Sequence, residues 1–215
     1  MRYDLLREMR ESLRHNNAVV LMDSIYSLPM AMEKKEAYFI DHGLWSMETH
    51  QILHKIYLNG VKIAFMYNTD VLMAIKDGHI DVSKLTEYNK NEIIKLIGNA
   101  DTLPYSMDNW VVRHLLWELP FMELKNKYNI FRGINYEREV FQRRGREIYP
   151  CLHWSKEDVL EYMNNYDIKI SGHEFEVVHV DVDNKAFISS VLAKNKMEDD
   201  FNRVKESLKA WGYID

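Results

Sequence analysis

Apolar residues in the first third of the chain alternate between a helical stripe and short, mostly apolar runs. The stripe lies among charged residues within positions 2–15 and is formed by Leu5, Leu6, Met9 and Leu13. It predicts an amphipathic helix. Three runs of strand length follow, at residues 18–22, 37–40 and 61–67. Such runs are typical of parallel strands buried on both faces.

Helices are predicted between these strands. Residues 23–27 form a loop that leads into a helix ending near Lys35, and Ser46 begins another helix that runs to Leu58. Strands separated by helices form βαβ units, so we expect a parallel sheet with right-handed crossovers.

Residues 68–108 carry a weaker pattern and are interpreted as an insertion in the sheet-forming core. Residues 81–83 and 91–97 indicate one or two helices, and residues 98–104 indicate a loop.

The apolar-rich segment 110–127 predicts a long helix. Pro120 lacks a backbone N–H and its ring collides with the preceding turn, so the helix should kink or split after Glu118. A later helix should begin at Ser155, whose role as N-cap is supported by Asp158 three residues on.

These elements predict an α/β fold, with a Rossmann-like open parallel sheet flanked by helices. Further strands are expected at residues 130–133 and 173–181, with two helices after them. The chain has no internal repeat or low-complexity tract. We interpret it as a single domain of residues 1–215, with a core at about 17–166, the insertion at about 68–108 and a C-terminal appendage at about 168–215.

Composition narrows the classes of function. The 215 residues are 47% hydrophobic and 28% charged, which is ordinary for a globular protein, and the apolar runs are too short to cross a bilayer. A single cysteine, Cys151, excludes an internal disulfide and points to a reducing compartment, so we expect a cytoplasmic protein. The net charge of −5 argues against a general nucleic-acid binder. The Met-, Asn- and Lys-rich composition would suit a phage or bacterial gene.

An arginine-rich segment follows the strand predicted at residues 130–133. Its members are Arg132, Arg138, Arg143, Arg144 and Arg146. Guanidinium groups this close repel one another unless anions lie among them, and arginine grips phosphate or sulfate oxygens two at a time. The alternative is a solvated basic loop paired with Glu137, Glu139 and Glu147.

Polar residues follow each predicted strand. In an open α/β sheet, ligands bind beyond the carboxyl ends of the strands, so residues 23–27, 41–48 and 67–70 and the loop after Gly133 should converge. Helix N-termini preceded by Ser24 or Ser27 and by Ser46 would add N–H donors for an anion. The alternative for each serine is a plain helix cap.

Two groups of motifs carry a resemblance to a known family. The first is Asp41-His42-Gly43 followed by Glu48-Thr49. The second is Gly133-Ile134-Asn135-Tyr136-Glu137, then the arginines, then Tyr149-Pro150, Trp154-Ser155 and Asp158-Val159. In order and spacing, over about residues 17–67 and 110–166, they resemble the phosphoadenosine phosphosulfate (PAPS) reductase family of the adenine nucleotide alpha hydrolase-like (HUP) superfamily.

The resemblance implies an adenine-nucleotide-binding protein, with Asp41 and Gly43 at the adenosine end and the arginines on phosphate or sulfate. PAPS, ATP or adenosine bisphosphate is the expected ligand, and no further cofactor is required. The residues expected to bind the nucleotide are Ser24, Ser27, Asp41, His42, Gly43, Arg132, Gly133, Glu137, Arg138, Arg143 and Arg144.

The chain departs from the family's ATP-cleaving relatives in one place and from the family itself in two. Residues 22–27 contain no glycine, so the backbone grip on pyrophosphate used by relatives that cleave ATP is not expected. Residues 209–215 contain no cysteine, whereas the family's catalytic thiolate lies near the C-terminus. Asn135 replaces an arginine of the family. Cys151 is interpreted as a small buried hydrophobe on a strand that leads to Trp154.

Two histidine groups are candidate metal sites. His50 and His54 lie four apart near His42, a spacing that two metal ligands can share. A looser group is His173, His179, Asp181 and Asp183. Surface or half-buried histidines explain the first pattern just as well, and no metal is expected at either group.

Three functions remain open. The first is a PAPS reductase-like nucleotide-binding protein that acts on a sulfuryl or adenylyl group without the family's cysteine, or that senses the nucleotide without turnover. The second is a catalytically inactive assembly module, with Trp211 and Tyr213 facing a protein partner or a second copy. The third is a thiolation-type nucleic-acid modification factor, which the lack of a broad basic face disfavours. Membranes and nucleic acids are not expected partners.

Overall fold

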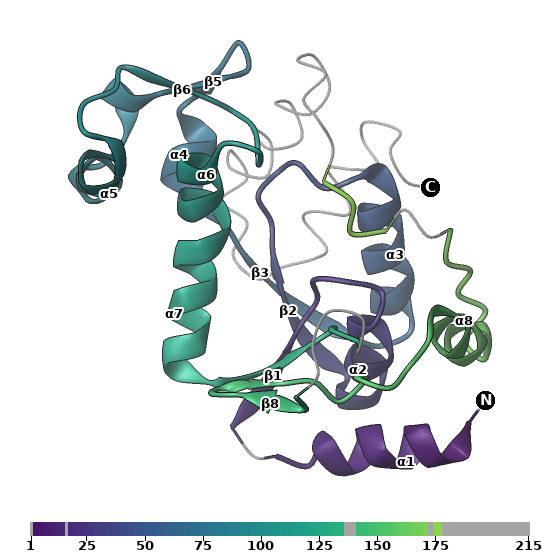
Figure 1. Cartoon of the computed structure of the whole chain (residues 1–215). Coiled ribbons are helices and arrows are strands. Elements are labelled where there is room, and N and C mark those ends of the chain that lie inside the picture. Colours follow the sequence, from purple (N-terminus) through teal and green to yellow (C-terminus); the bar gives the residue numbers. More distant parts are fainter. Residues whose placement is uncertain (1, 16, 136–140, 172–173, 178–215) are drawn as a thin grey trace. The chain divides into compact units, whose positions relative to one another are not determined.

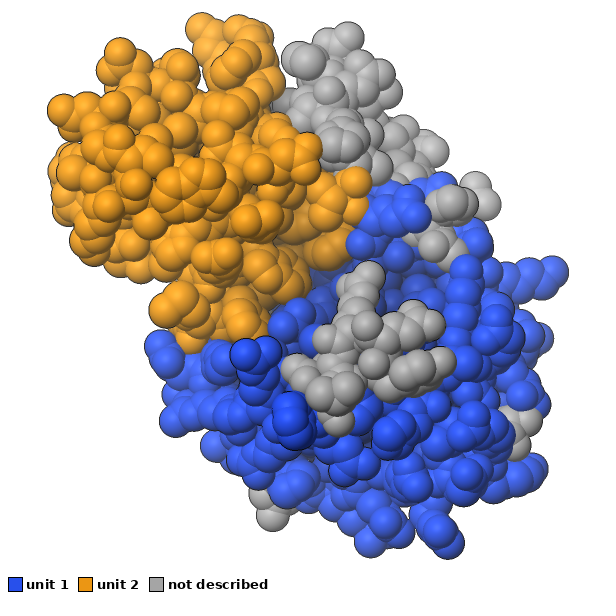
Figure 2. Space-filling model, in the orientation of Figure 1, with its two compact units in different colours: residues 1–39, 46–64, 124–176 blue, residues 40–45, 65–123, 177–215 orange. Residues whose placement is uncertain are grey.

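The computed structural model describes residues 2–15, 17–135, 141–171 and 174–177 (Figure 1). Contacts divide the chain into two compact units, coloured separately in Figure 2. The first unit comprises residues 1–39, 46–64 and 124–176, and the second comprises residues 40–45, 65–123 and 177–215.

Six strands form the main sheet, in the order β3-β2-β1-β7-β9-β8. Their bounds are β1 Ala18–Leu21, β2 Glu36–Ile40, β3 Lys62–Met66, β7 Asn129–Arg132, β8 Arg143–Arg144 and β9 Glu147–Ile148. Strand β1 runs parallel to β2 and β7, and β7 runs parallel to β9, whereas β8 is antiparallel to β9. The predicted fold class, a mostly parallel α/β sheet flanked by helices, is confirmed.

Four helices of the first unit have bounds close to those predicted. They are α1 Tyr3–Ser12, α2 Ser27–Lys34, α3 Met47–Leu58 and α8 Lys156–Asn164. The Ser46 hydroxyl caps α3 by accepting the Thr49 N–H, and Ser155 and Asp158 form a reciprocal capping box at α8. These caps satisfy N–H groups that the first turn of a helix leaves unpaired.

The core of the first unit lies between α2 and the strands β1 and β7. Val20 of β1 pairs in register with Phe131 of β7, and both side chains are buried. Helix α2 packs against these strands and against α8, with Leu28 and Met30 fully buried. The apolar runs that predicted central strands therefore form the buried part of this unit.

The second unit has its own apolar core and a small antiparallel sheet in the order β4-β5-β6. Its elements are α4 Thr69–Met73, β4 Ile75–Lys76, β5 His79–Asp81, the 3-10 turn η1 Val82–Lys84, α5 Glu87–Ile97, β6 Thr102–Pro104, α6 Trp110–Arg113, the π-helical segment η2 His114–Glu118 and the start of α7 Leu119–Lys127. Ile80, Val112 and Leu116 are among its buried core residues.

The segment 110–127 is helical throughout, and its hydrogen-bonding pattern changes from π-helical to α-helical beside Pro120, where a kink or split was predicted. The π-helical segment η2 ends at Glu118, and α7 begins at Leu119. Proline cannot donate the i to i−4 hydrogen bond, and a single π turn is a common way to accommodate such a break.

Several local predictions were wrong. The expected loop at residues 98–104 contains β6, which pairs with β5 through a buried Leu103. The arginine segment contains the short hairpin of β8 and β9. Cys151 lies in a turn, not in a strand. These elements are two or three residues long or depend on partners far along the chain, so local pattern does not reveal them.

The expected strand at residues 173–181 lies largely outside the described residues, as do the two helices expected after it. Within the described part, Glu174 and Phe175 form a turn, and Val177 makes an isolated antiparallel bridge to Trp45. None of the described helices is long and apolar enough to span a membrane.

A partly buried charged network in the first unit joins three helices. Arg10 of α1 donates two hydrogen bonds to the Glu33 carboxylate of α2, at 3.0 and 2.7 Å. The Tyr162 hydroxyl of α8 donates to the same carboxylate at 2.7 Å. Burial alone would raise the pKa of Glu33, but the hydrogen bonds from Arg10 and Tyr162 outweigh it and hold the pKa below its ordinary value.

We expect Glu33→Gln to lower the free energy of unfolding by about 1 kcal/mol at pH 7, a modest value because the network is partly exposed. A lowered pKa in the folded state stabilises the fold above the ordinary glutamate pKa, and this contribution is lost as pH falls through the lowered value. The difference from wild type should therefore shrink between pH 6 and pH 3 in urea unfolding. Glu8→Gln, at an exposed position of α1, is the matched control. A difference that does not change with pH would contradict the assignment.

Candidate functional site

The ends of β1 and β7 are tied together by one carboxylate. Asp23, directly after β1, accepts a hydrogen bond from Arg132 Nε at 2.7 Å and from the Gly133 N–H at 3.2 Å. The Asp23 and Arg132 side chains are largely buried. This charge-assisted pair fixes the start of both loops at the carboxyl edge of the sheet.

The loop after β1 also touches Gly133 directly. The Ser24 hydroxyl donates to the Gly133 carbonyl, and the Ser27 hydroxyl donates to the Ser24 carbonyl at 2.5 Å. A Cβ atom added at Gly133 would meet the Ser24 hydroxyl and would lie 2.5 Å from the Ser27 nitrogen. The close approach of the two loops therefore requires glycine at position 133. Three residues predicted to bind the nucleotide, Ser24, Ser27 and Gly133, are brought together here.

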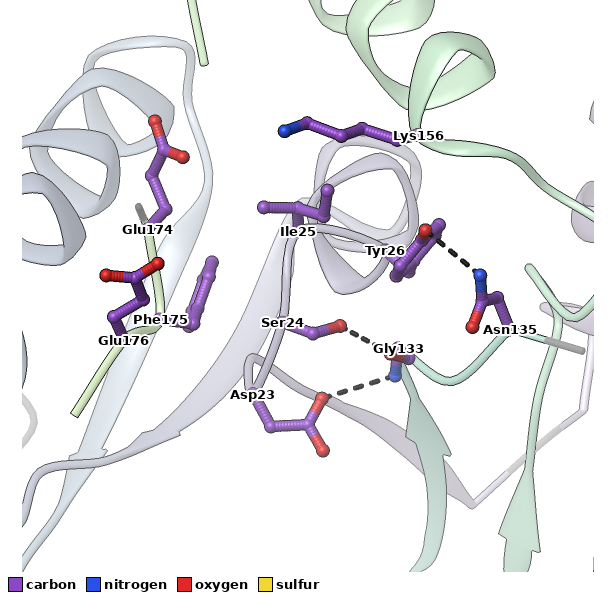
Figure 3. A pocket seen from close by; sticks show the side chains of 10 residues that line it. All are labelled: Asp23, Ser24, Ile25, Tyr26, Gly133, Asn135, Lys156, Glu174, Phe175 and Glu176. Atoms are coloured by element: carbon purple, nitrogen blue, oxygen red, sulfur yellow. Dashed lines mark hydrogen bonds between the residues drawn. The ribbon is translucent and has the colours of Figure 1, made fainter. Parts of the chain in front are cut away.

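Above this contact lies a cavity of about 310 Å³ (Figure 3). All of its lining residues belong to the first unit. They are Asp23, Ser24, Ile25, Tyr26, Gly133, Asn135, Lys156, Glu174, Phe175 and Glu176.

The side chains of the lining come from three directions. Asn135, after β7, is buried and donates from Nδ2 to the Tyr26 hydroxyl at 3.0 Å. Lys156, the first residue of α8, extends over the cavity (Figure 3). Phe175 lies on the side of the β1–α2 loop opposite Asn135 (Figure 3). The cavity thus offers two aromatic rings, a side-chain amide and an ammonium group, together with the carboxylates of Asp23, Glu174 and Glu176.

The position of the cavity in the sheet is informative. Within the sheet, β2 and β3 lie on one side of β1, and β7 lies on the other side of β1. The strand order therefore reverses between β1 and β7. The cavity lies at the carboxyl ends of these two strands. Open α/β sheets bind ligands outside the carboxyl ends of the strands at such a reversal.

Two of the arginines expected to face an anion bind groups of the protein. Arg132 contacts Asp23 and also donates to Glu147 at 3.1 Å. Burial alone would lower the pKa of its guanidinium, but the two carboxylates outweigh it and raise the pKa. Arg146 donates to the backbone carbonyls of Lys125 and Asn126 at 2.9 and 2.6 Å, where α7 ends.

Arg143 and Arg144 do not line the cavity. Arg143 and Arg144 are exposed on β8, and Arg143 Nε donates to the Gly145 carbonyl at 3.0 Å. Glu137 and Arg138 lie outside the described residues. Binding of an anion by this arginine group stays a prediction.

The remaining predicted residues, Asp41, His42 and Gly43, form a buried turn in the second unit. Asp41 Oδ1 accepts the Gly43 N–H at 2.8 Å, and Gly43 has the positive φ of 72° that favours glycine. His42 Nδ1 accepts the Leu44 N–H at 3.1 Å, and the His42 carbonyl accepts the Tyr105 hydroxyl at 2.8 Å. The motif is therefore an ordered turn at the end of β2. Its contact with adenosine stays a prediction.

The candidate metal-binding histidines do not form a metal-binding cluster among the described residues. His50 is buried on α3, and His173 and His179 lie outside the described residues. Within the described ranges, no group of three or more His, Cys, Asp or Glu side chains is arranged to hold a metal ion.

Cys151 is a fully buried residue of the first unit, as predicted. Its Sγ lies 3.5 Å from Met9 Sδ, and burial raises the pKa of the thiol. The residue packs as a small hydrophobe and does not line the cavity.

The fold and this cavity define an open α/β sheet protein with a ligand-sized cavity at the reversal of its strand order. No family model and no curated protein matches the sequence. Among solved structures it is similar to the crystal structure of phosphoadenylyl-sulfate (PAPS) reductase from Candida auris in a phosphate complex. The TM-score is 0.42 and the sequence identity 15%, over 77% of this chain and 79% of that chain.

Sequence reasoning missed several lining residues. Lys156 directly follows Ser155, the predicted N-cap, so its position at the start of a helix could have been predicted from the sequence. Tyr26 lies inside the predicted β1–α2 loop but carries no polar motif. Phe175 and its neighbours lie far along the chain, and no local signal connects them to β1.

We expect Gly133→Ala to lower the free energy of unfolding by about 2–3 kcal/mol, because the new methyl group collides with the β1–α2 loop. The matched control is Gly145→Ala in the same unit, where φ is +62° and a Cβ meets nothing within 4 Å. That change should cost only the strain of a left-handed backbone, about 1 kcal/mol. Urea unfolding measures both, and equal losses would show that the loop yields to the added methyl group.

We expect Cys151 to be inert to a thiol-specific disulfide reagent at pH 8 in the folded protein and to react fully in denaturant, because the reactive thiolate is disfavoured by burial. Absorbance of the released thiol gives the extent of labelling. Complete labelling within minutes, with an unchanged circular dichroism spectrum, would contradict the buried position.

Proposed function

We propose that this protein binds an adenine nucleotide in the cavity at the carboxyl ends of β1 and β7. The observation that carries the proposal is the position of the cavity at the reversal of strand order. Its volume of about 310 Å³ lies within the range of small-molecule sites.

The lining suits a ligand with an aromatic part and an anionic part. Tyr26 and Phe175 offer ring faces, and Asn135 offers an amide, which are groups that suit a nucleobase or ribose. Lys156 offers a positive charge at the start of α8, where the helix dipole adds to it. A nucleoside phosphate has both parts.

The choice of an adenine nucleotide rests on the sequence. The Asp41-to-Gly43 and Gly133-to-Val159 motifs resemble the PAPS reductase family, whose members take such nucleotides. Arg138, Arg143 and Arg144 remain the proposed contacts for additional phosphate or sulfate, in addition to the ammonium group of Lys156.

The proposal concerns binding that does not use cysteine chemistry. Cys151 is the chain's one cysteine, and it is buried with a raised pKa. It does not supply a thiolate to the cavity. Turnover at a sulfuryl or adenylyl group would therefore need a nucleophile other than a cysteine of this chain.

We expect AMP, ATP, PAPS or adenosine 3′,5′-bisphosphate to raise the unfolding temperature of the wild type. A ligand at a hundred times its Kd adds about 2.7 kcal/mol to the stability of the folded state. Lys156→Ala should weaken nucleotide binding about five- to tenfold in isothermal titration, through loss of a charge-assisted contact to phosphate. The matched control is Lys169→Ala, at an exposed lysine that does not line the cavity.

Different outcomes would remove different parts of the proposal. If none of the four nucleotides changes the unfolding temperature, nucleotide binding is wrong and the assembly-module interpretation gains support. If a nucleotide binds the wild type and both lysine variants equally, the ligand lies elsewhere than in this cavity.

A further inference from the structure

Phe175 has an unusual backbone conformation. Its φ is +65°, in the left-handed region that side chains other than glycine rarely adopt. Among the described residues, the other non-glycine positions with positive φ are Asn17, Lys35, Asp77 and Asp167. Asparagine and aspartate tolerate this region, and Lys35 is a helix C-cap, where it is common. A bulky aromatic residue there is a true outlier and needs a cause.

The cause is a set of hydrogen bonds that holds the chain on both sides of the ring. The Phe175 N–H donates to Thr49 Oγ1 of α3 at 2.9 Å. The Glu176 carbonyl accepts the N–H of Ser46, the N-cap of α3, at 3.0 Å. The buried Glu174 carboxylate accepts the Ser171 N–H at 2.5 Å. These contacts lie within the first unit and fix the strained turn.

The result of this anchoring is the direction of the ring. Phe175 is only half-buried, although the acidic side chain before it is buried. Its ring lines the cavity beside Ser24 and Ile25 (Figure 3). Burial of the phenyl group does not explain the left-handed backbone at Phe175. The turn buries the Glu174 carboxylate and leaves the Phe175 ring facing the cavity. Phenylalanine has no polar atom, so what it offers there is an apolar π face.

We propose that Phe175 is the base-stacking residue of the site and that the adenine ring lies against its face. This inference rests on the proposed nucleotide binding and adds which part of the ligand lies at the 174–176 turn. Thr49 is a positioning residue, because it acts only through the backbone of Phe175. Stacking on a phenyl ring tolerates any base, so Phe175 contributes affinity for the nucleobase and little discrimination among bases.

The test compares AMP with adenosine, which shares the base and lacks the phosphate. We expect Phe175→Ala to raise the Kd for both ligands by the same factor, about tenfold, in titrations followed by NMR up to millimolar ligand. Phe175→Tyr keeps the ring and should bind like wild type. Phe175→Leu keeps apolar bulk without a π face and should resemble Phe175→Ala. The matched control is Phe141→Ala, at an exposed phenylalanine that does not line the cavity.

Each result bears on the inference separately from the proposed function. Wild-type protein that binds neither AMP nor adenosine would overturn the stacking role, and the unfolding temperature with all four nucleotides would then decide whether the proposed nucleotide binding stands. Wild-type affinity retained by Phe175→Ala or Phe175→Leu would overturn the stacking role and leave nucleotide binding in place. A loss for AMP but not for adenosine would show that the turn acts on the phosphate end. An unchanged unfolding temperature shows that each variant is folded.

Discussion

The contact that the rest of the site depends on is the tie between Asp23 and the end of β7. The Asp23 carboxylate accepts from Arg132 and from the Gly133 N–H, and Glu147 and Lys125 extend the pair into a chain of alternating charges. These charges are partly buried, and each is paired with an opposite charge, because loss of a partner would leave a desolvated charge uncompensated. The network therefore holds β1, β7, β9 and the end of α7 in one arrangement, and the floor of the cavity follows from it.

The Asp23–Arg132 pair also changes the interpretation of the arginine-rich segment as an anion site. Five close guanidinium groups predict an anion only if no carboxylate or carbonyl of the protein already faces them. Arg132 donates to Asp23, which lies 109 positions away in the sequence, and Arg146 donates to backbone carbonyls at the end of α7. The arginine count alone therefore overstates the charge left for a ligand, since Arg132, Arg143 and Arg146 already donate to groups of the protein.

Local signals were sufficient for much of the fold. Ser46 and Ser155 marked helix starts because a capping hydroxyl acts within three residues, and Pro120 marked a break because its missing N–H is a local property. The cavity needed more than local signals. The residues of its floor could be predicted, because parallel strands end at one edge of the sheet. The position of Phe175 could not be predicted, because it depends on a hydrogen bond to Thr49 that leaves no periodic pattern in the sequence.

Two of the three carboxylates in the lining are engaged by groups of the protein, and the third, Glu176, is exposed. Asp23 is neutralised by Arg132, and an oxygen of Glu174 is turned to the Ser171 N–H. Lys156 supplies a positive charge at a helix start, where backbone N–H groups add to it. The aromatic side of the cavity is fixed before any ligand arrives, because the strained turn at Phe175 is already held by its hydrogen bonds. A ligand that uses both groups would lose less entropy on binding than one that has to order the turn itself.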